Sequence, residues 1–156
     1  TTDTQGLPFT PERIIYDEAS GKLILIPASG TDQITVLDFN TSNGSFSNST
    51  PISNSVGSGN FGGADFSPDG SFIYYSLGNQ LFRVPSNDLS ASPEEIPLNN
   101  PQEAIHDVKV GPDGSLYYIY EETAGGPQLI GKVDNPNEPD LTLVTTDEDP
   151  FMGADF

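Results

Sequence analysis

Cysteine and tryptophan are both absent from this sequence of 156 residues. The absence of cysteine excludes disulfide bonds, thiolate metal sites and cysteine nucleophiles, and it leaves the cellular compartment open. Basic residues are scarce as well, because five lysines and arginines face 23 aspartates and glutamates, for a formal net charge of -18 at pH 7. An acidic surface of this kind repels phosphate backbones and anionic lipid headgroups, so we expect no nucleic-acid partner.

Long hydrophobic runs are missing too. No stretch approaches the roughly 18 to 20 apolar residues that a membrane-spanning helix needs, so we expect no membrane insertion. No long window carries apolar residues at helical spacing without an interrupting glycine or proline, which argues against helices. The residues that are present suit strands, since 16 glycines and 14 prolines lie at intervals between short β-rich runs. We therefore expect an all-β fold.

A repeated tetrapeptide is the most informative feature of the chain. Gly63-Ala64-Asp65-Phe66 recurs as residues 153–156, ninety positions later. Between the copies, residues 67–75 (SPDGSFIYY) are echoed by residues 111–119 (GPDGSLYYI), 44 positions on. Both spacings fit a period of about 45 residues, and four short strands per period are typical of a β-propeller. Each repeat is expected to form one antiparallel sheet, or blade.

The length of the chain predicts an incomplete ring. It corresponds to about three and a half four-stranded blades, whereas closed propellers use roughly four to eight. We expect residues 1–156 to form one partial propeller within a larger ring, completed by the remaining blades of a longer polypeptide or by a second copy sharing one seven-bladed ring. An uncovered end would make the chain by itself dimerise or aggregate. The expected blades are residues 13–53, 62–99 and 104–146, and a further blade starts at 151–156.

Four strands are expected in each of the three blades, from period-2 alternation and turn residues. The expected strands are residues 14–16, 23–26, 33–39 and 46–52 in the first, 63–66, 72–76, 80–84 and 95–98 in the second, and 107–110, 116–120, 128–133 and 141–145 in the third.

The Pro-Asp-Gly turns that open two hairpins have a structural explanation. Proline sets φ for entry into the turn, aspartate bonds its own backbone ahead, and glycine adopts the positive φ that closes a tight hairpin. We expect Asp69 and Asp113 to be turn residues rather than catalytic ones.

The sequence around the first of these turns resembles a known repeat. Residues 66–70 (FSPDG), followed by 72–75 (FIYY) and 81–84 (LFRV), resemble the WD40-like propeller repeat of the TolB and lactonase-like kind. They are also similar to propeller segments in large surface proteins of gliding or adhesive Bacteroidota. The missing tryptophan removes the Trp-Asp ending of the true WD40 repeat and argues against a eukaryotic-type scaffold. The resemblance implies an extracellular or cell-surface bacterial setting.

Three aspartates are candidate metal ligands. In a propeller the innermost strand of each blade lines the central channel, which would place Asp65, Asp107 and Asp155 near the axis. Convergent carboxylates without basic neighbours suit Ca²⁺ or Mg²⁺. The alternative is that each aspartate accepts local backbone hydrogen bonds and recurs because the blade recurs. His106, beside Asp107, is a candidate for base work or metal ligation in the metal-dependent case.

Two functions from different classes remain open at this point. The first is a non-catalytic binding or scaffold module, which meets a protein or glycan through loops at 42–60, 86–93 and 123–127. The second is a lactonase-like or other hydrolytic propeller with a divalent metal on the axis. No nucleophile elbow and no second histidine accompany His106, so the binding module is the preferred prediction.

Overall fold

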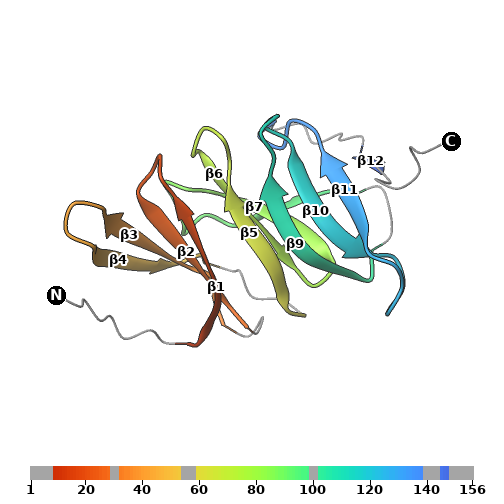
Figure 1. The fold of residues 1–156 in the computed structure, drawn as a ribbon, viewed down its shortest axis with the longest axis horizontal. Coiled ribbons are helices and arrows are strands. Elements are labelled where there is room, and N and C mark those ends of the chain that lie inside the picture. The colour runs from red at the N-terminus through yellow and green to blue at the C-terminus, as the bar shows by residue number, and fades with distance from the viewer. Residues whose placement is uncertain (1–8, 29–31, 54–58, 99–101, 139–144, 148–156) are drawn as a thin grey trace, which may run out of the picture.

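The computed structural model describes residues 9–28, 32–53, 59–98, 102–138 and 145–147. In these ranges the chain is all-β, and its twelve strands form three four-stranded antiparallel sheets. The sheets follow one another along the chain and lie side by side in a row, with the first sheet at one end and the third at the other (Figure 1). Among the described residues no helix could cross a membrane. The predicted fold class is confirmed.

Each sheet is a simple up-and-down meander in which every strand pairs with the next one in the sequence. The first sheet contains β1 (Pro11–Asp17), β2 (Lys22–Pro27), β3 (Thr35–Asn40) and β4 (Ser45–Pro51). The second contains β5 (Phe61–Phe66), β6 (Phe72–Leu77), β7 (Gln80–Pro85) and β8 (Glu94–Ile96). The third contains β9 (Ala104–Val110), β10 (Leu116–Glu121), β11 (Leu129–Val133) and β12 (Thr145–Asp147).

The first strand of each sheet begins earlier than the sequence predicted, at Pro11, Phe61 and Ala104. In each case the pairing with the second strand continues through a register shift, which is the mark of a β-bulge. A bulge interrupts the alternation of apolar and polar residues, so the alternation did not predict the strand residues that precede the bulge. Two fourth strands also differ, because β8 ends at Ile96 and β12 occupies 145–147; residues 141–144 of the expected strand lie outside the described ranges.

The two Pro-Asp-Gly turns have the predicted conformation. Gly70 and Gly114 have φ values of 70° and 81°. The carboxylates of Asp69 and Asp113 accept the backbone N–H of the residue two positions ahead, each at 3.1 Å. The prediction that both aspartates are turn residues is confirmed, and glycine is needed after each because other residues adopt this φ only at a cost.

The aspartates of these turns, Asp69 and Asp113, make the stability of the fold vary with pH in the acidic range. Hydrogen bonds from the Ser67 and Ser71 hydroxyls hold the pKa of Asp69 far below its ordinary value of 3.8, and the backbone N–H of Ser115 lowers the pKa of Asp113 to about 2. Each carboxyl group has a lower pKa in the folded chain than in the unfolded chain, so it stabilises the fold fully at any pH above the unfolded-state pKa. This stabilisation is lost as the pH falls through the folded-state pKa. We expect urea unfolding of the wild type to lose stability steadily below pH 4.

Asp69→Asn provides the check, because an amide keeps the turn geometry and does not titrate. Its free energy of unfolding is expected to vary less with pH below about 4 than that of the wild type. Glu122→Gln, at an exposed glutamate outside the turns, serves as the matched control. Parallel curves for the wild type and Asp69→Asn would contradict the prediction.

The core lies between the sheets and is built by a repeated rule. We call the side of a sheet turned toward the next sheet in the chain its forward face, and the opposite side its rear face. The forward face of the first sheet, with Ile24 and Val36, packs on the rear face of the second, with Ile73, Tyr75 and Val84. All five side chains are buried.

The second contact between sheets follows the same rule. The forward face of the second sheet, with Tyr74 and Leu81, packs on the rear face of the third, with Val108, Leu116 and Tyr118. Adjacent tyrosines of β6 therefore enter different cores, since successive side chains of a strand point to opposite sides. Each sheet buries its apolar sides only against its neighbours, as in repeat architectures.

A buried arginine ties the second sheet to the third. Arg83 on β7 is only 3% exposed. Its Nε and Nη2 donate to Glu94 at 2.8 and 2.7 Å, and its Nη1 donates to the carbonyl oxygens of Pro136 and Glu138 at 2.9 and 3.1 Å. The guanidinium also lies 4.9 Å from the ring centre of Phe72. The segment after β11 is thus held against the second sheet by hydrogen bonds as well as apolar contact.

Candidate functional site

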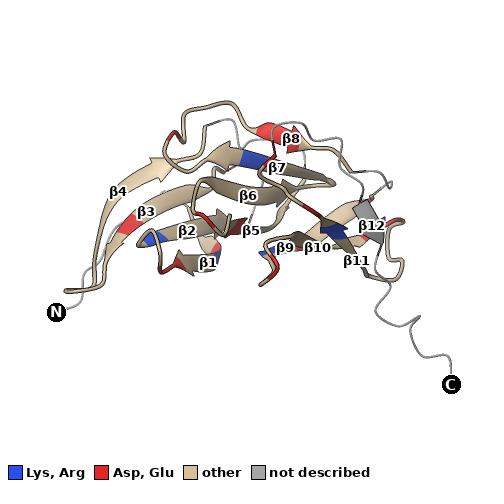
Figure 2. Cartoon of the chain, turned by 90° about the horizontal axis from the view of Figure 1, so that it is seen from above, with Lys and Arg blue, Asp and Glu red and all other residues tan. Residues whose placement is uncertain are grey.

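The first strands β1, β5 and β9 lie near one another at one side of the molecule, which we call the inner edge. Figure 2 shows the three sheets as a fan, with β1, β5 and β9 toward its centre and β4, β8 and β12 toward its outside. Side chains of the three inner strands can therefore meet even though contacting residues are 45 to 94 positions apart in the sequence. The predicted site residues Asp65 and Asp107 both lie on these strands.

Glycine makes the close approach of β5 to β9 possible. A Cβ on Gly62 would overlap the backbone carbonyl oxygen of Ile105 and lie 2.9 Å from the carbonyl carbon of His106. A Cβ on Gly63 would overlap the Asp107 carboxylate and lie 2.7 Å from the backbone nitrogen of Val108. The second half of the repeated tetrapeptide is placed by this contact, because Asp65 follows directly in the same strand.

Asp65 joins the second sheet to the third. One carboxylate oxygen accepts the backbone N–H of Phe66 at 3.0 Å, and the other accepts that of Val110 on β9 at 3.0 Å. Lys109 lies 3.4 Å from the second oxygen. Asp65 thus accepts backbone hydrogen bonds, which was the alternative to metal binding that the sequence suggested. The nearby Lys109 was not predicted from the sequence.

Asp107 joins the third sheet to the first. Its Oδ1 accepts a hydrogen bond from Arg13 at 3.0 Å and from the backbone N–H of Val108 at 2.8 Å. Arg13 also donates to the carbonyl oxygen of His106 at 3.4 Å. Sequence reasoning missed Arg13, although one signal was available: with five basic residues against 23 acids, each cation is expected to have a carboxylate partner.

The metal hypothesis can be compared with these contacts. Both described carboxylates already face a cation, Lys109 for Asp65 and Arg13 for Asp107, which disfavours a divalent ion between them. In the described ranges no three His, Cys, Asp or Glu side chains converge as metal ligands would. Asp155 lies outside the described ranges, so the three-carboxylate set stays a prediction.

His106 lies at the inner edge with one carboxylate near it. Its Nε2 is 3.6 Å from Glu121, beyond ordinary hydrogen-bond distance. This nitrogen is buried and makes no hydrogen bond to any described residue. A protonated imidazole would pair with Glu121, and a polar ligand could instead take the free position on the ring.

A pocket of about 440 Å³ with one polar wall opens beside His106. It lies at the edge of the sheets where the inner strands β1, β5 and β9 begin, which we call the start edge. The opposite edge carries the Pro-Asp-Gly turns, and we call it the turn edge. Small residues from β5 and the β6–β7 turn form its floor, among them Gly62 and Gly78. Its polar wall consists of Glu12, Arg13, Asn60, Glu103 and His106.

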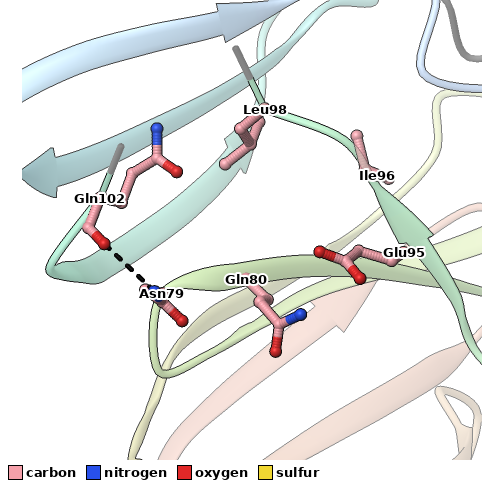
Figure 3. Close-up of a pocket in the computed structure, with 6 residues that line it drawn as sticks. All are labelled: Asn79, Gln80, Glu95, Ile96, Leu98 and Gln102. Atoms are coloured by element: carbon pink, nitrogen blue, oxygen red, sulfur yellow. Dashed lines mark hydrogen bonds between the residues drawn. The ribbon is translucent and has the colours of Figure 1, made fainter. Parts of the chain in front are cut away.

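A second polar pocket, of about 370 Å³, lies farther out on the same edge (Figure 3). Asn79 donates to the backbone carbonyl of Gln102 at 3.2 Å. The Nε2 of Gln102 is buried without a hydrogen-bond partner among the described residues. Gly78 lines the inner pocket and Asn79 the outer one, so the two adjoin. Side chains of Asn79, Gln80, Glu95, Ile96, Leu98 and Gln102 line the outer pocket.

Two of the three loops named as binding loops touch each other, because the Ser53 amide donates to the Leu89 carbonyl oxygen at 2.8 Å. Because strands alternate in direction, residues 86–93 after β7 lie at the turn edge and residues 123–127 after β10 lie at the start edge. A bond from the Ser86 amide to the Ser71 carbonyl, at 2.9 Å, places the first of these loops beside the Pro-Asp-Gly turn. Residues 42–60 reach from one edge to the other, and 54–58 lie outside the described ranges.

Comparison with solved structures places this arrangement in a fold class. An inactive variant of virginiamycin B lyase from Staphylococcus aureus, with quinupristin, matches with a TM-score of 0.57 and 17% identity, over 87% of this chain and 40% of that one. A structure described as a gluconolactonase matches with a TM-score of 0.58 and 18% identity, over 91% of this chain and 50% of that one. The three sheets are part of a β-propeller.

At these identities the likeness shows the propeller fold alone. The chain spans half or less of the length of the two solved propellers. No protein-family model matches the chain, and no curated protein matches its sequence. The three sheets are thus three blades, and the inner edge is the side that faces the propeller axis.

Proposed function

We propose that this propeller segment is a non-catalytic binding module of a secreted or surface-attached bacterial protein, and that it binds a neutral glycan at the start edge. The observation that carries the proposal is a pair of adjoining pockets with polar groups: one lies at the inner edge where all three blades meet, and the other lies between the second blade and the segment that leads to the third. Concave sites with a few well-placed polar groups are the usual form of ligand sites. The resemblance of the repeats to those of bacterial surface proteins supports the proposed location.

The contacts of the two inner-edge aspartates, Asp65 and Asp107, support binding rather than catalysis. Asp65 and Asp107 each bond to the backbone of the chain and to a cation of their own chain. Carboxylates held in this way brace the blades and are poorly placed to accept a proton from a substrate. His106 then provides a polar contact at the pocket wall.

The chemistry of the pockets favours sugar hydroxyls. Asn60, Asn79, Gln80 and Gln102 can each donate and accept hydrogen bonds, which suits hydroxyl groups that do both. Buried Gln102 Nε2 is a donor with no partner among the described residues. The net charge of -18 disfavours acidic sugars, so the expected glycan is neutral.

Binding can be tested by calorimetry with neutral oligosaccharides. We expect His106→Ala and Gln102→Ala each to weaken binding about tenfold, because each removes one buried nitrogen that can hydrogen-bond to the ligand. Asn87→Ala, an exposed amide at the turn edge, is the matched control and is expected to leave affinity unchanged.

Equal losses for Asn87→Ala and Gln102→Ala would contradict a site at the start edge. Binding of a protein partner without any glycan would contradict the proposed glycan ligand, while the start edge would remain the proposed binding site. A second candidate, a lactonase-like propeller with Ca²⁺ at Asp65, Asp107 and Asp155, is favoured only by His106 at the inner edge with Glu121 of the neighbouring strand β10 near it. A large rise of the melting temperature with calcium, abolished by Asp155→Ala, would favour that candidate.

A further inference from the structure

The outer pocket has an apolar side and a polar side (Figure 3). In the figure Ile96 and Leu98 lie along one side of it, and Asn79 and Gln80 lie along the other. Ile96 is buried and Leu98 is half-buried, and both belong to the edge of the core between the second and third blades. The pocket therefore offers two unlike surfaces to one ligand group.

The β6–β7 turn at the polar side is fixed to its neighbours. Gly78 donates its amide to the Asn60 carbonyl oxygen and accepts the Ile105 amide at its own carbonyl oxygen, each at 2.9 Å. The side chain of Asn79 donates to the backbone of Gln102 at 3.2 Å. A ligand that contacts this turn therefore meets groups that are already ordered, which lowers the cost of binding.

Two polar groups of opposite hydrogen-bonding kind lie at the ends of the pocket in Figure 3. Gln102 Nε2 is a donor, and it has no hydrogen-bond partner among the described residues. Glu95 is exposed, and its ionised carboxylate can only accept. A ligand group that carries an acceptor and a donor pointing in opposite directions can pair with both.

The apolar side of the pocket is aliphatic. None of the described residues that line it is aromatic, so it lacks the flat surface on which the C–H face of a sugar ring stacks. Leu98 and Ile96 instead suit a compact apolar group such as a methyl.

We propose that the outer pocket binds the acetamido group of an N-acetylated sugar, an inference that rests on the proposed glycan-binding function. The acetamido carbonyl oxygen accepts from Gln102, its N–H donates to Glu95, and its methyl packs against Leu98. In a trans amide the C=O and the N–H point in opposite directions, which matches polar partners at the two ends of the pocket. An amide is uncharged, so the sugar is still the neutral glycan that the acidic chain favours.

Sugars without the acetyl group fit the same pocket less well. A hydroxyl in place of the acetamido group leaves the aliphatic side without an apolar contact. An ammonium group would be attracted to Glu95, but it has only donors, so it cannot pair with Gln102 Nε2. It would also lose hydration beside Leu98.

Calorimetry with three matched trisaccharides tests the proposal. The β-1,4-linked trimers of N-acetylglucosamine, glucosamine and glucose share their linkage and differ only in the group at the second carbon of each ring. We expect the acetylated trimer to bind at least tenfold more tightly than either of the others, because it alone satisfies both polar groups and the apolar side.

Glu95→Ala, at an exposed position, should weaken binding of the acetylated trimer about tenfold and leave the affinity for the glucose trimer unchanged. Glu18→Ala removes the same group from the exposed β1–β2 turn and should leave both affinities unchanged. Nuclear Overhauser contacts are expected between an acetyl methyl and the methyl groups of Leu98. Contacts to Ala104 of the inner pocket in place of Leu98 would overturn the proposed site.

Failure of the acetamido site and failure of glycan binding give different results. Equal affinity for the acetylated and glucose trimers would overturn the acetamido site and leave glycan binding intact. Tighter binding of the glucosamine trimer would also overturn it, because charge would then decide the choice of ligand. Absence of binding by all three trimers would overturn the acetamido site and the proposed function together.

Discussion

Gly62→Ala is expected to lower the free energy of unfolding by about 3 kcal/mol or more, because the added methyl group must displace the backbone of the neighbouring blade. The Cβ would overlap the Ile105 carbonyl oxygen, which is fixed by its place at the start of β9, and lie 2.6 Å from the Ser76 hydroxyl oxygen. The hydroxyl can rotate away only by giving up its buried hydrogen bond from the Gly63 N–H, and the carbonyl cannot move without shifting β9. Urea unfolding, followed by far-ultraviolet circular dichroism, measures the loss.

Gly125→Ala is the control for the backbone effect of removing a glycine. Gly125 has a φ of 73° and open space around its Cβ position. Its replacement costs only the strain of a left-handed conformation, about 1 kcal/mol. A cost for Gly62→Ala no larger than that for Gly125→Ala would show that β5 and β9 are not in the close contact described here.

Arg83→Met is expected to cost about 3 kcal/mol, because the substitution leaves two carbonyl oxygens without their buried donor. These are the carbonyls of Pro136 and Glu138, whereas Asn137 between them keeps its own hydrogen bonds to Tyr74 and Asp69 of the second blade. Methionine fills similar volume, so the loss measures the hydrogen bonds more than a cavity. Hydrogen exchange should also show the segment after β11 opening more readily than in the wild type.

The matched comparison is Glu94→Gln, which changes the other partner of the same ion pair. Glu94 is 54% exposed, so its carboxylate is largely hydrated and its loss should cost less than about 1 kcal/mol. If Glu94→Gln were as damaging as Arg83→Met, the loss would come from the ion pair within the second blade and not from the carbonyl contacts between the blades.

Local signals in the sequence predicted the hairpins. Asp69-Gly70 and Asp113-Gly114 need only their own backbone to form the turn, so residue type and order suffice to recognise them. The starts of β1, β5 and β9 were misplaced because the bulges there depend on pairing with a second strand, and a bulge leaves no periodic trace in the first one.

The inner edge was predicted only in part. The repeat placed Asp65 and Asp107 on first strands, but it did not supply their partners Val110 and Arg13, which lie 45 and 94 residues away. Arg83 is similar, since two of its three partners belong to another blade. Such contacts depend on the side-by-side packing of blades, and sequence spacing does not encode it.

The amino-acid sequence by itself determined the class of fold, because a period of about 45 residues with four short strands and two turn motifs is a property of local segments. Only the tertiary structure decided the roles of the charged residues at the inner edge and the position of the two polar pockets. The physical reason is distance along the chain: a turn is stabilised by atoms a few residues apart, whereas a carboxylate becomes a brace or a ligand according to which distant strand packs beside it.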